Sequence, residues 1–228
     1  MGQAKLRRIF TQQGHGKCAY CGAAATSRDH VPPECVFVGA DLELITVPAC
    51  DAHNGKRSKA DEELRNYISV QVGKGSPAKT ELWAKAFRSF NLNKKTKMRA
   101  IERIEWHPDK KHFTMLADDA QIETVLQSIV RGLFFHHFKR RVPEGIRVEA
   151  YSLRIGVQFF ECMDGLNVCS VGNDQFIYAY GHNRLRPNNT VWIMGFHQGF
   201  GAYGTTGRIL QDSDQDTDDT TMGQSGLK

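Results

Sequence analysis

The segment KCAYCGAAATSRDHVPP (residues 17–33) brings three features together within a short stretch of chain. Cys18 and Cys21 are separated by two residues, which is the spacing of a zinc knuckle. Asp29 and His30 follow, and two prolines come shortly behind them. The segment therefore indicates two roles, a structural metal site and a histidine placed for chemistry.

A second knuckle follows, in which Cys50 and His53 are again separated by two residues. Three thiolates and one imidazole, supplied by two tight turns, are a ligand set that tetrahedral Zn²⁺ prefers. The sequence therefore predicts one structural zinc ion bound by Cys18, Cys21, Cys50 and His53. The alternative is free thiols and an unrelated histidine. The 28 residues between the knuckles exceed the usual zinc-ribbon spacing of about 15–20. The knuckles therefore enclose an insertion, and it carries Asp29 and His30.

The run from Cys18 to Ser58 resembles the HNH endonucleases, whose ββα-metal core often lies inside such a zinc frame. The matching segments are RDHVPP (28–33) and LITVPACDAHNGKRS (44–58). The resemblance implies a first strand with an acidic residue next to a histidine, a second strand that ends in VPAC, and a helix that opens with an asparagine shortly before a lysine.

The resemblance also implies a role for each matching residue. His30 matches the general base that activates water, Asp29 matches a carboxylate ligand of a divalent cation, and Asn54 matches the second ligand of that cation. The central asparagine of the family falls on Ile45, a departure that concerns the loop between the strands more than the chemistry.

These residue types suit phosphodiester hydrolysis, which needs an activated water and a cation that neutralises charge on the phosphate. A histidine with an ordinary pKa of about 6.5 can accept a proton near neutral pH. A carboxylate and an amide oxygen are ligands for Mg²⁺ or Mn²⁺. Adjacent strand residues point to opposite faces, so Asp29 and His30 share one site only if the strand bends.

Each of these assignments has a simpler alternative. His30 could belong to a zinc module that only binds DNA. Asp29 could cap a turn, and Asn54 could cap the helix that it opens.

The charge of the chain is consistent with a polyanionic partner. The net charge is +5, and without residues 211–228, which hold five Asp and one Lys, it is +9. Such a surface concentrates nucleic acid, although a merely solvated basic face is about as common. Lys56, Arg57 and Lys59 are expected to contact phosphates. Double-stranded DNA is the expected partner, RNA is the alternative, and homodimerisation and protein partners are left open.

Hydrophobic periodicity predicts an α+β fold with a small N-terminal metal domain, a helical middle, and a C-terminal helix on an antiparallel sheet. The resemblance implies that the N-terminal domain is a zinc-stabilised ββα-metal (HNH) domain. The expected helices are 4–13, one or two after Cys50, 80–90 and 120–141. The expected strands are 42–50, a hairpin within 103–116, 146–155, 157–163, 175–181 and 190–196. The glycine-aromatic segment 195–207 is interpreted as a turn-rich edge, with a base-stacking surface as the alternative.

The predicted domains are a zinc-framed nuclease domain (1–75), a helical and hairpin connector (76–119), an α+β domain of unassigned role (120–210) and a disordered acidic tail (211–228). No apolar run reaches the roughly 20 residues of a membrane span, and the N-terminus lacks a signal-peptide pattern, so a cytoplasmic protein is expected. The resemblance therefore implies a metal-dependent HNH endonuclease with structural Zn²⁺ and catalytic Mg²⁺ or Mn²⁺, with genome defence or a mobile element as the expected setting. The alternative is a non-catalytic, zinc-stabilised nucleic-acid-binding protein.

Overall fold

The computed structural model describes residues 16–71, 77–92, 94–109, 113–153 and 165–207. These residues form a mixture of helices and antiparallel strands, as the predicted α+β class requires. The helix predicted at 4–13, the strand predicted at 157–163 and the acidic tail lie outside the described residues.

A small hairpin carries the sequence motif. Strands β1 (Ser27–His30) and β2 (Thr46–Ala49) are antiparallel, with Asp29 opposite Val47 and His30 opposite Thr46. The 3₁₀ turn η1 (Glu34–Val36) lies between them, and the helices α2 (Asp51–Asn54) and α3 (Ser58–Gln71) follow β2. Of the strand expected at 42–50, only the later part, β2, is present. The elements of the motif therefore follow in the order strand, strand, helix.

The middle of the chain is helical, as expected, and ends in a hairpin. Helix α4 (Pro77–Leu92) contains the predicted helix, and α5 (Lys94–Glu102) was not predicted. The predicted hairpin is present as β3 (Ile104–Trp106) and β4 (Phe113–Met115). Helix α5 lacked a clear signal because its residues KKTKMRAIE are mostly polar, and its formation depends on contact with α4.

Helix α6 (Asp119–Phe138) matches the predicted long helix closely. Its N-cap is Asp118, whose side chain accepts a hydrogen bond from the backbone N–H of Gln121, and its C-cap is Lys139 in a left-handed conformation (φ 54°). Its buried face is formed by Ile122, Val125, Leu126, Ile129, Val130 and Leu133. The spacing of these residues is that of one apolar stripe along a helix.

The C-terminal sheet has five antiparallel strands in the order β5-β9-β8-β7-β6. They are β5 (Val148–Leu153), β6 (Asn167–Val171), β7 (Phe176–His182), β8 (Thr190–Phe196) and β9 (Phe200–Thr206). The interpretation of 195–207 as a turn-rich edge was wrong, because β9 is an interior strand paired with both β5 and β8.

Packing against α6 explains why β9 has glycine at position 204, and the sequence pattern did not reveal this. A Cβ atom at Gly204 would lie 2.5 Å from Cγ2 of Val130 on α6 and 3.5 Å from Cβ of Ala150 on β5. Glycine therefore lets the helix approach the sheet closely, and its presence does not mark a turn here.

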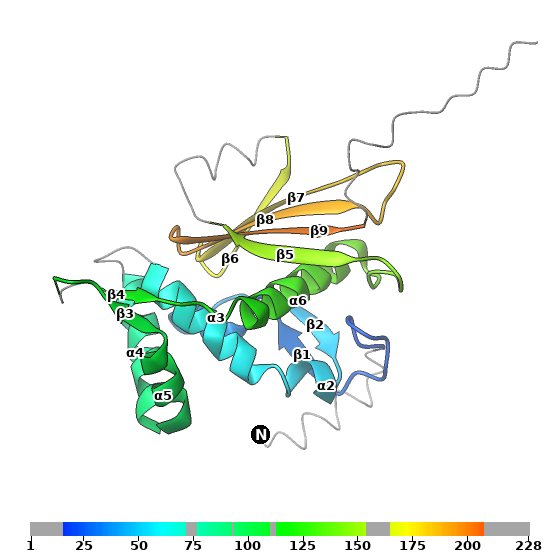
Figure 1. Cartoon of the computed structure of the whole chain (residues 1–228). Coiled ribbons are helices and arrows are strands. Elements are labelled where there is room, and N and C mark those ends of the chain that lie inside the picture. The colour runs from blue at the N-terminus through cyan, green and yellow to red at the C-terminus, as the bar shows by residue number, and fades with distance from the viewer. Residues whose placement is uncertain (1–15, 72–76, 93, 110–112, 154–164, 208–228) are drawn as a thin grey trace, which may run out of the picture.

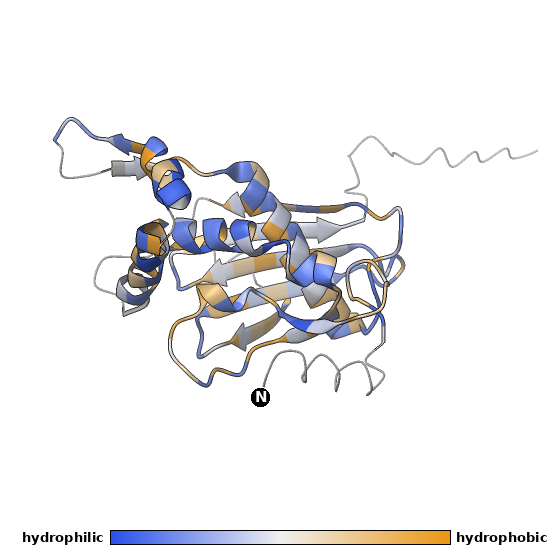
Figure 2. Ribbon diagram, turned by 90° about the horizontal axis from the view of Figure 1, so that it is seen from below, coloured by the Kyte–Doolittle hydropathy of each residue, from blue (hydrophilic) through white to orange (hydrophobic). Residues whose placement is uncertain are grey.

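Helix α6 is the middle layer of the molecule. Figure 1 shows the five-stranded sheet on one side of α6 and the β1–β2 hairpin on the other. One hydrophobic cluster joins the hairpin, the helices and the sheet, and it includes Val31, Val47, Leu82, Leu126 and Trp192. In Figure 2 the helices carry hydrophilic and hydrophobic residues together, as expected for helices that border this core. The described part of the hairpin, the middle helices and the sheet therefore share one core, and the predicted domain boundaries near 75 and 120 stay a prediction.

No helix in the described part of the chain is both long and apolar enough to cross a bilayer.

We expect Gly132→Ala to destabilise the protein, although alanine normally favours a helix by about 1 kcal/mol over glycine. A Cβ at Gly132 would lie 2.6 Å from Cγ2 and 2.9 Å from Cγ1 of the buried, β-branched Val31. Overpacking of this kind costs about 1–3 kcal/mol. Urea denaturation measures the change, with the exposed α6 variant Thr124→Ala as control. An unchanged or raised midpoint for Gly132→Ala would show that α6 and the hairpin do not pack tightly.

We also expect stability to fall as pH decreases from about 6.5 towards 4, in part through His137. Burial, and then the nearby His136 and Lys139, lower the pKa of His137 to about 4. The unfolded chain, with an ordinary histidine pKa of about 6.5, binds the proton first as pH falls, so protonation favours unfolding in this window.

Denaturant midpoints at pH 7.5 and 5 measure this pH effect. The decrease of the denaturant midpoint between the two pH values should be smaller for His137→Asn than for the wild type. It should equal that of the wild type for His107→Asn, on the exposed β3–β4 hairpin. An equal loss in all three proteins would contradict the assignment to His137.

Candidate metal centre and active site

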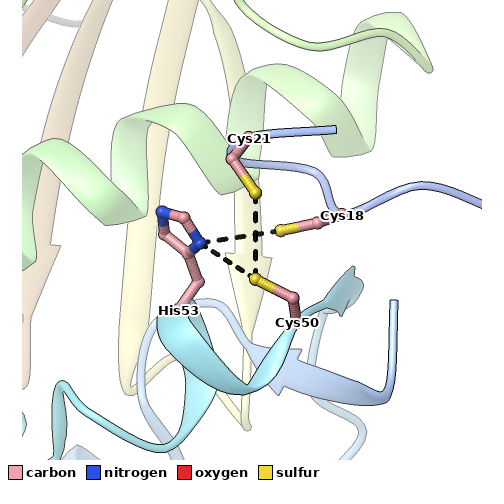
Figure 3. A group of neighbouring side chains, drawn as sticks. All are labelled: Cys18, Cys21, Cys50 and His53. Carbon is pink, nitrogen blue, oxygen red and sulfur yellow. Dashed lines mark hydrogen bonds between the residues drawn. The ribbon is translucent and has the colours of Figure 1, made fainter. Parts of the chain in front are cut away.

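The structure brings the four predicted zinc ligands together. The Sγ atoms of Cys18, Cys21 and Cys50 and a ring nitrogen of His53 all lie within 4.8 Å of one another, and Figure 3 shows the side chains pointing toward a common centre. The Sγ atoms of Cys21 and Cys50 are 3.8 Å apart, and Nδ1 of His53 is 3.2 Å from Sγ of Cys50 and 3.9 Å from Sγ of Cys18.

These distances fit the edges of a zinc tetrahedron. With Zn–S near 2.3 Å and Zn–N near 2.0–2.1 Å, tetrahedral geometry requires about 3.8 Å between two sulfur atoms and about 3.6 Å between sulfur and nitrogen. The donor set and its spacing therefore fit Zn²⁺, with Nδ1 as the histidine donor.

Local backbone structure explains how the two knuckles form. The N–H of Gly22 donates to the carbonyl of Cys18 (2.9 Å), and Gly22 has φ 79°, a conformation that favours glycine. In the second knuckle Cys50 is the N-cap of α2, and the N–H of His53 donates to its carbonyl (3.0 Å). Each knuckle is thus one tight turn that places two ligand side chains on the same side.

Asp29 lies beside this centre, in a buried hydrogen-bonded network. Its Oδ2 accepts a hydrogen bond from the hydroxyl of Tyr20 (2.6 Å) and another from Nη2 of Arg57 (2.7 Å). Burial, and then the charge of Asp29, raise the pKa of Tyr20, so the phenol is the donor at neutral pH. The other carboxylate oxygen of Asp29, Oδ1, accepts no hydrogen bond from the described residues.

Arg57 is buried in the same network as Asp29. Its side chain is only 8% exposed and also pairs with Asp61, 3.0 Å from Nε to Oδ1. Burial alone would lower its pKa, but Asp29, Tyr20 and Asp61 outweigh this effect and raise it. Arg57 is thus a buried ion-pair residue, whereas Lys56 and Lys59 are exposed. The predicted phosphate contact suits the two lysines better than Arg57, and it stays a prediction.

Asn54 holds strand β1 from the end of α2. Its Nδ2 donates to Oγ of Ser27 (2.8 Å) and to the carbonyl of Arg28 (3.0 Å). The amide oxygen accepts no hydrogen bond from the described part of the chain. Asn54 is therefore held against β1, the strand that carries Asp29, and each of the two side chains retains one oxygen that could face a cation.

His30 has a different partner from the Asp29 network. Its side chain is 37% exposed, and its Nδ1 lies 3.6 Å from Oε2 of Glu34. Adjacent strand residues alternate between faces, and the burial of the two residues follows that rule: Asp29 is buried and His30 is half-exposed. Among the described residues the two side chains share no partner.

The C-terminal sheet supports the loop that follows His30. The side-chain amide of Gln175 accepts from the N–H of Val38 (2.7 Å) and donates to its carbonyl (2.8 Å). Nε2 of His197 donates to the carbonyl of Val36 (2.8 Å). Residues about 140 to 160 positions away in the sequence therefore hold the backbone near the candidate base.

Sequence reasoning missed Tyr20, Gln175 and His197. Tyr20 could have been noticed as the one aromatic residue inside the first knuckle. Gln175 and His197 have no comparable signal, because their contacts depend on how the sheet packs.

Comparison of the chain with protein-family models, with curated proteins and with solved structures found no match. The resemblance to HNH endonucleases therefore stays a prediction.

We expect purified protein to contain about one zinc ion per chain, because the four donor atoms have the spacing that one tetrahedral ion requires. Cys50→Ser should lose zinc and lower the thermal midpoint, since metal binding contributes to folding. Elemental analysis and a melting curve measure both, with Cys169→Ser, outside the cluster, as control. Metal-free wild type with an unchanged melting curve on adding zinc would contradict the site.

Proposed function

We propose that the protein is a metal-dependent endonuclease of the HNH type, which hydrolyses phosphodiester bonds, with DNA as the first expected substrate. One observation carries the proposal: a half-exposed histidine, His30, lies on a strand that a Cys3His cluster, Asp29 and Asn54 hold in place. A zinc-binding module that only stabilises itself does not require these three residues together.

His30 is the proposed general base. Its half-exposed ring would be accessible to a phosphodiester and to the attacking water, whereas the surrounding strand is fixed by hydrogen bonds of Asn54 to Ser27 and Arg28. Glu34, 3.6 Å from Nδ1 of His30, is placed to orient the ring through that nitrogen. Nε2 would then accept the proton of the water.

Asp29 and Asn54 are the proposed ligands of the divalent cation. Oδ2 of Asp29 is engaged by Tyr20 and Arg57, and Nδ2 of Asn54 is engaged by β1, which leaves one hard oxygen on each side chain. Such oxygens suit Mg²⁺ or Mn²⁺. For this cation and His30 to act on one phosphate, strand β1 must bend so that both side chains reach the same side. The bound cation would then neutralise charge on the phosphate in the transition state.

Exposed positive charge near this site supports a nucleic-acid substrate. Lys56 and Lys59 lie at and just after the turn from α2 into α3, directly following the motif, and both are exposed. Contacts of lysine with phosphate supply affinity without sequence specificity.

The second candidate is a zinc-stabilised nucleic-acid-binding protein without catalysis. The ion pair between Asp29 and Arg57 favours it, because a carboxylate already neutralised by an arginine attracts a cation less strongly. The two functions differ in whether cleavage occurs and whether it depends on His30.

We expect His30→Ala to reduce cleavage of plasmid DNA by at least about 100-fold, the lower range for loss of a general base. Zinc content and DNA affinity should not change, because the zinc ligands and the exposed lysines remain. Gel analysis with Mg²⁺, Mn²⁺ or chelator measures cleavage on plasmid, linear DNA and RNA, and His107→Ala is the control.

Three results would count against the proposal. Full cleavage by His30→Ala would exclude that residue as the base, and cleavage in chelator would exclude the divalent cation. DNA binding without cleavage under any condition would favour the non-catalytic candidate.

A further inference from the structure

Tyr20 connects the zinc cluster to the candidate cation ligand. It lies inside the first knuckle, between Cys18 and Cys21, so its backbone position depends on two of the zinc ligands. Its ring stacks on that of His53, with centroids 5.3 Å apart and planes 15° apart. Its hydroxyl donates to Oδ2 of Asp29 (2.6 Å).

Arg57 completes this arrangement from the turn before α3. Its guanidinium lies over the Tyr20 ring, 5.7 Å from the centroid, and Nη2 donates to the same Oδ2 of Asp29 (2.7 Å). Nη1 of Arg57 is buried and has no hydrogen-bond partner among the described residues. Two donors from different parts of the chain therefore converge on one carboxylate oxygen.

We infer that Tyr20 is a positioning residue, which transmits the geometry of the zinc-bound knuckle to Asp29 and thereby presents Oδ1 of Asp29 to the divalent cation. The inference rests on the proposed function, in which Asp29 is a cation ligand. It adds a dependence: the affinity of the cation site depends on the phenol hydroxyl of Tyr20, a group that binds neither metal.

The geometry explains why one hydroxyl matters. A carboxylate held at Oδ2 by two donors has a fixed plane, and its second oxygen has a fixed direction. With the hydroxyl removed, Arg57 still neutralises Asp29, but the carboxylate can turn about the single remaining hydrogen bond, and Asp29 becomes a weaker ligand. Groups that orient a metal ligand in this way typically change metal affinity by about 10–100-fold.

Tyr20→Phe tests the inference, because it removes the hydroxyl and retains the ring that stacks on His53. We expect unchanged zinc content and a dissociation constant for Mn²⁺ raised by about 10-fold or more. Electron paramagnetic resonance of free Mn²⁺, titrated into zinc-loaded protein, measures this constant without any activity. The control is Tyr67→Phe, whose ring packs against Phe200 away from the cluster.

Cleavage assays add a second readout. For Tyr20→Phe the Mn²⁺ concentration that gives half-maximal cleavage should rise, and the rate at saturating Mn²⁺ should approach that of the wild type. A variant that merely unfolds in part would lose the maximal rate and would not recover it with added metal.

The outcomes separate the inference from the proposed function. No Mn²⁺ binding by the wild type, or equal binding by wild type and Asp29→Asn, would overturn the cation site and the inference with it. Mn²⁺ binding that needs Asp29 but is the same in Tyr20→Phe would overturn only the inference. Loss of zinc from Tyr20→Phe would also overturn it, because Tyr20 would then act on the zinc frame itself.

Discussion

The candidate site depends on one constraint, the spacing of four side chains around a common point. These side chains are Cys18, Cys21, Cys50 and His53. Strands β1 and β2 are only four residues long, and an isolated hairpin of this length is at best marginally stable in water. A tetrahedral ion at the cluster would join the knuckle before β1 to the helix after β2 and thus close the hairpin at one end.

Helix α6 provides the second support, from the other side of the hairpin. Close approach at Gly132 lets Val31, the residue after His30, pack directly on the helix, and Gly204 lets the sheet approach the opposite face. The C-terminal half therefore has a structural role for the site. It buries the base of the hairpin and, through Gln175 and His197, holds the loop behind His30.

The network around Asp29 can be interpreted in two ways that differ in physical consequence. As a closed ion pair with Arg57, Asp29 would only secure strand β1 to α3, because separating a buried charge pair is costly. As an oriented carboxylate with one oxygen left over, it would be a ligand whose direction is set by Tyr20 and Arg57. Cation binding distinguishes the two roles of Asp29, because only the oriented carboxylate would bind a divalent cation.

The sequence by itself determined the α+β class, the members of the Cys3His cluster, the long helix and most strands, because knuckle spacing and apolar periodicity are local properties of the chain. Tertiary structure alone decided three points. Arg57 is buried because Asp29 and Asp61 neutralise it. The glycine-rich strand β9 is interior because α6 packs closely on it. Tyr20 contacts Asp29 because folding of the zinc knuckle brings its hydroxyl to strand β1, and a contact across the fold leaves no periodic signal in the sequence.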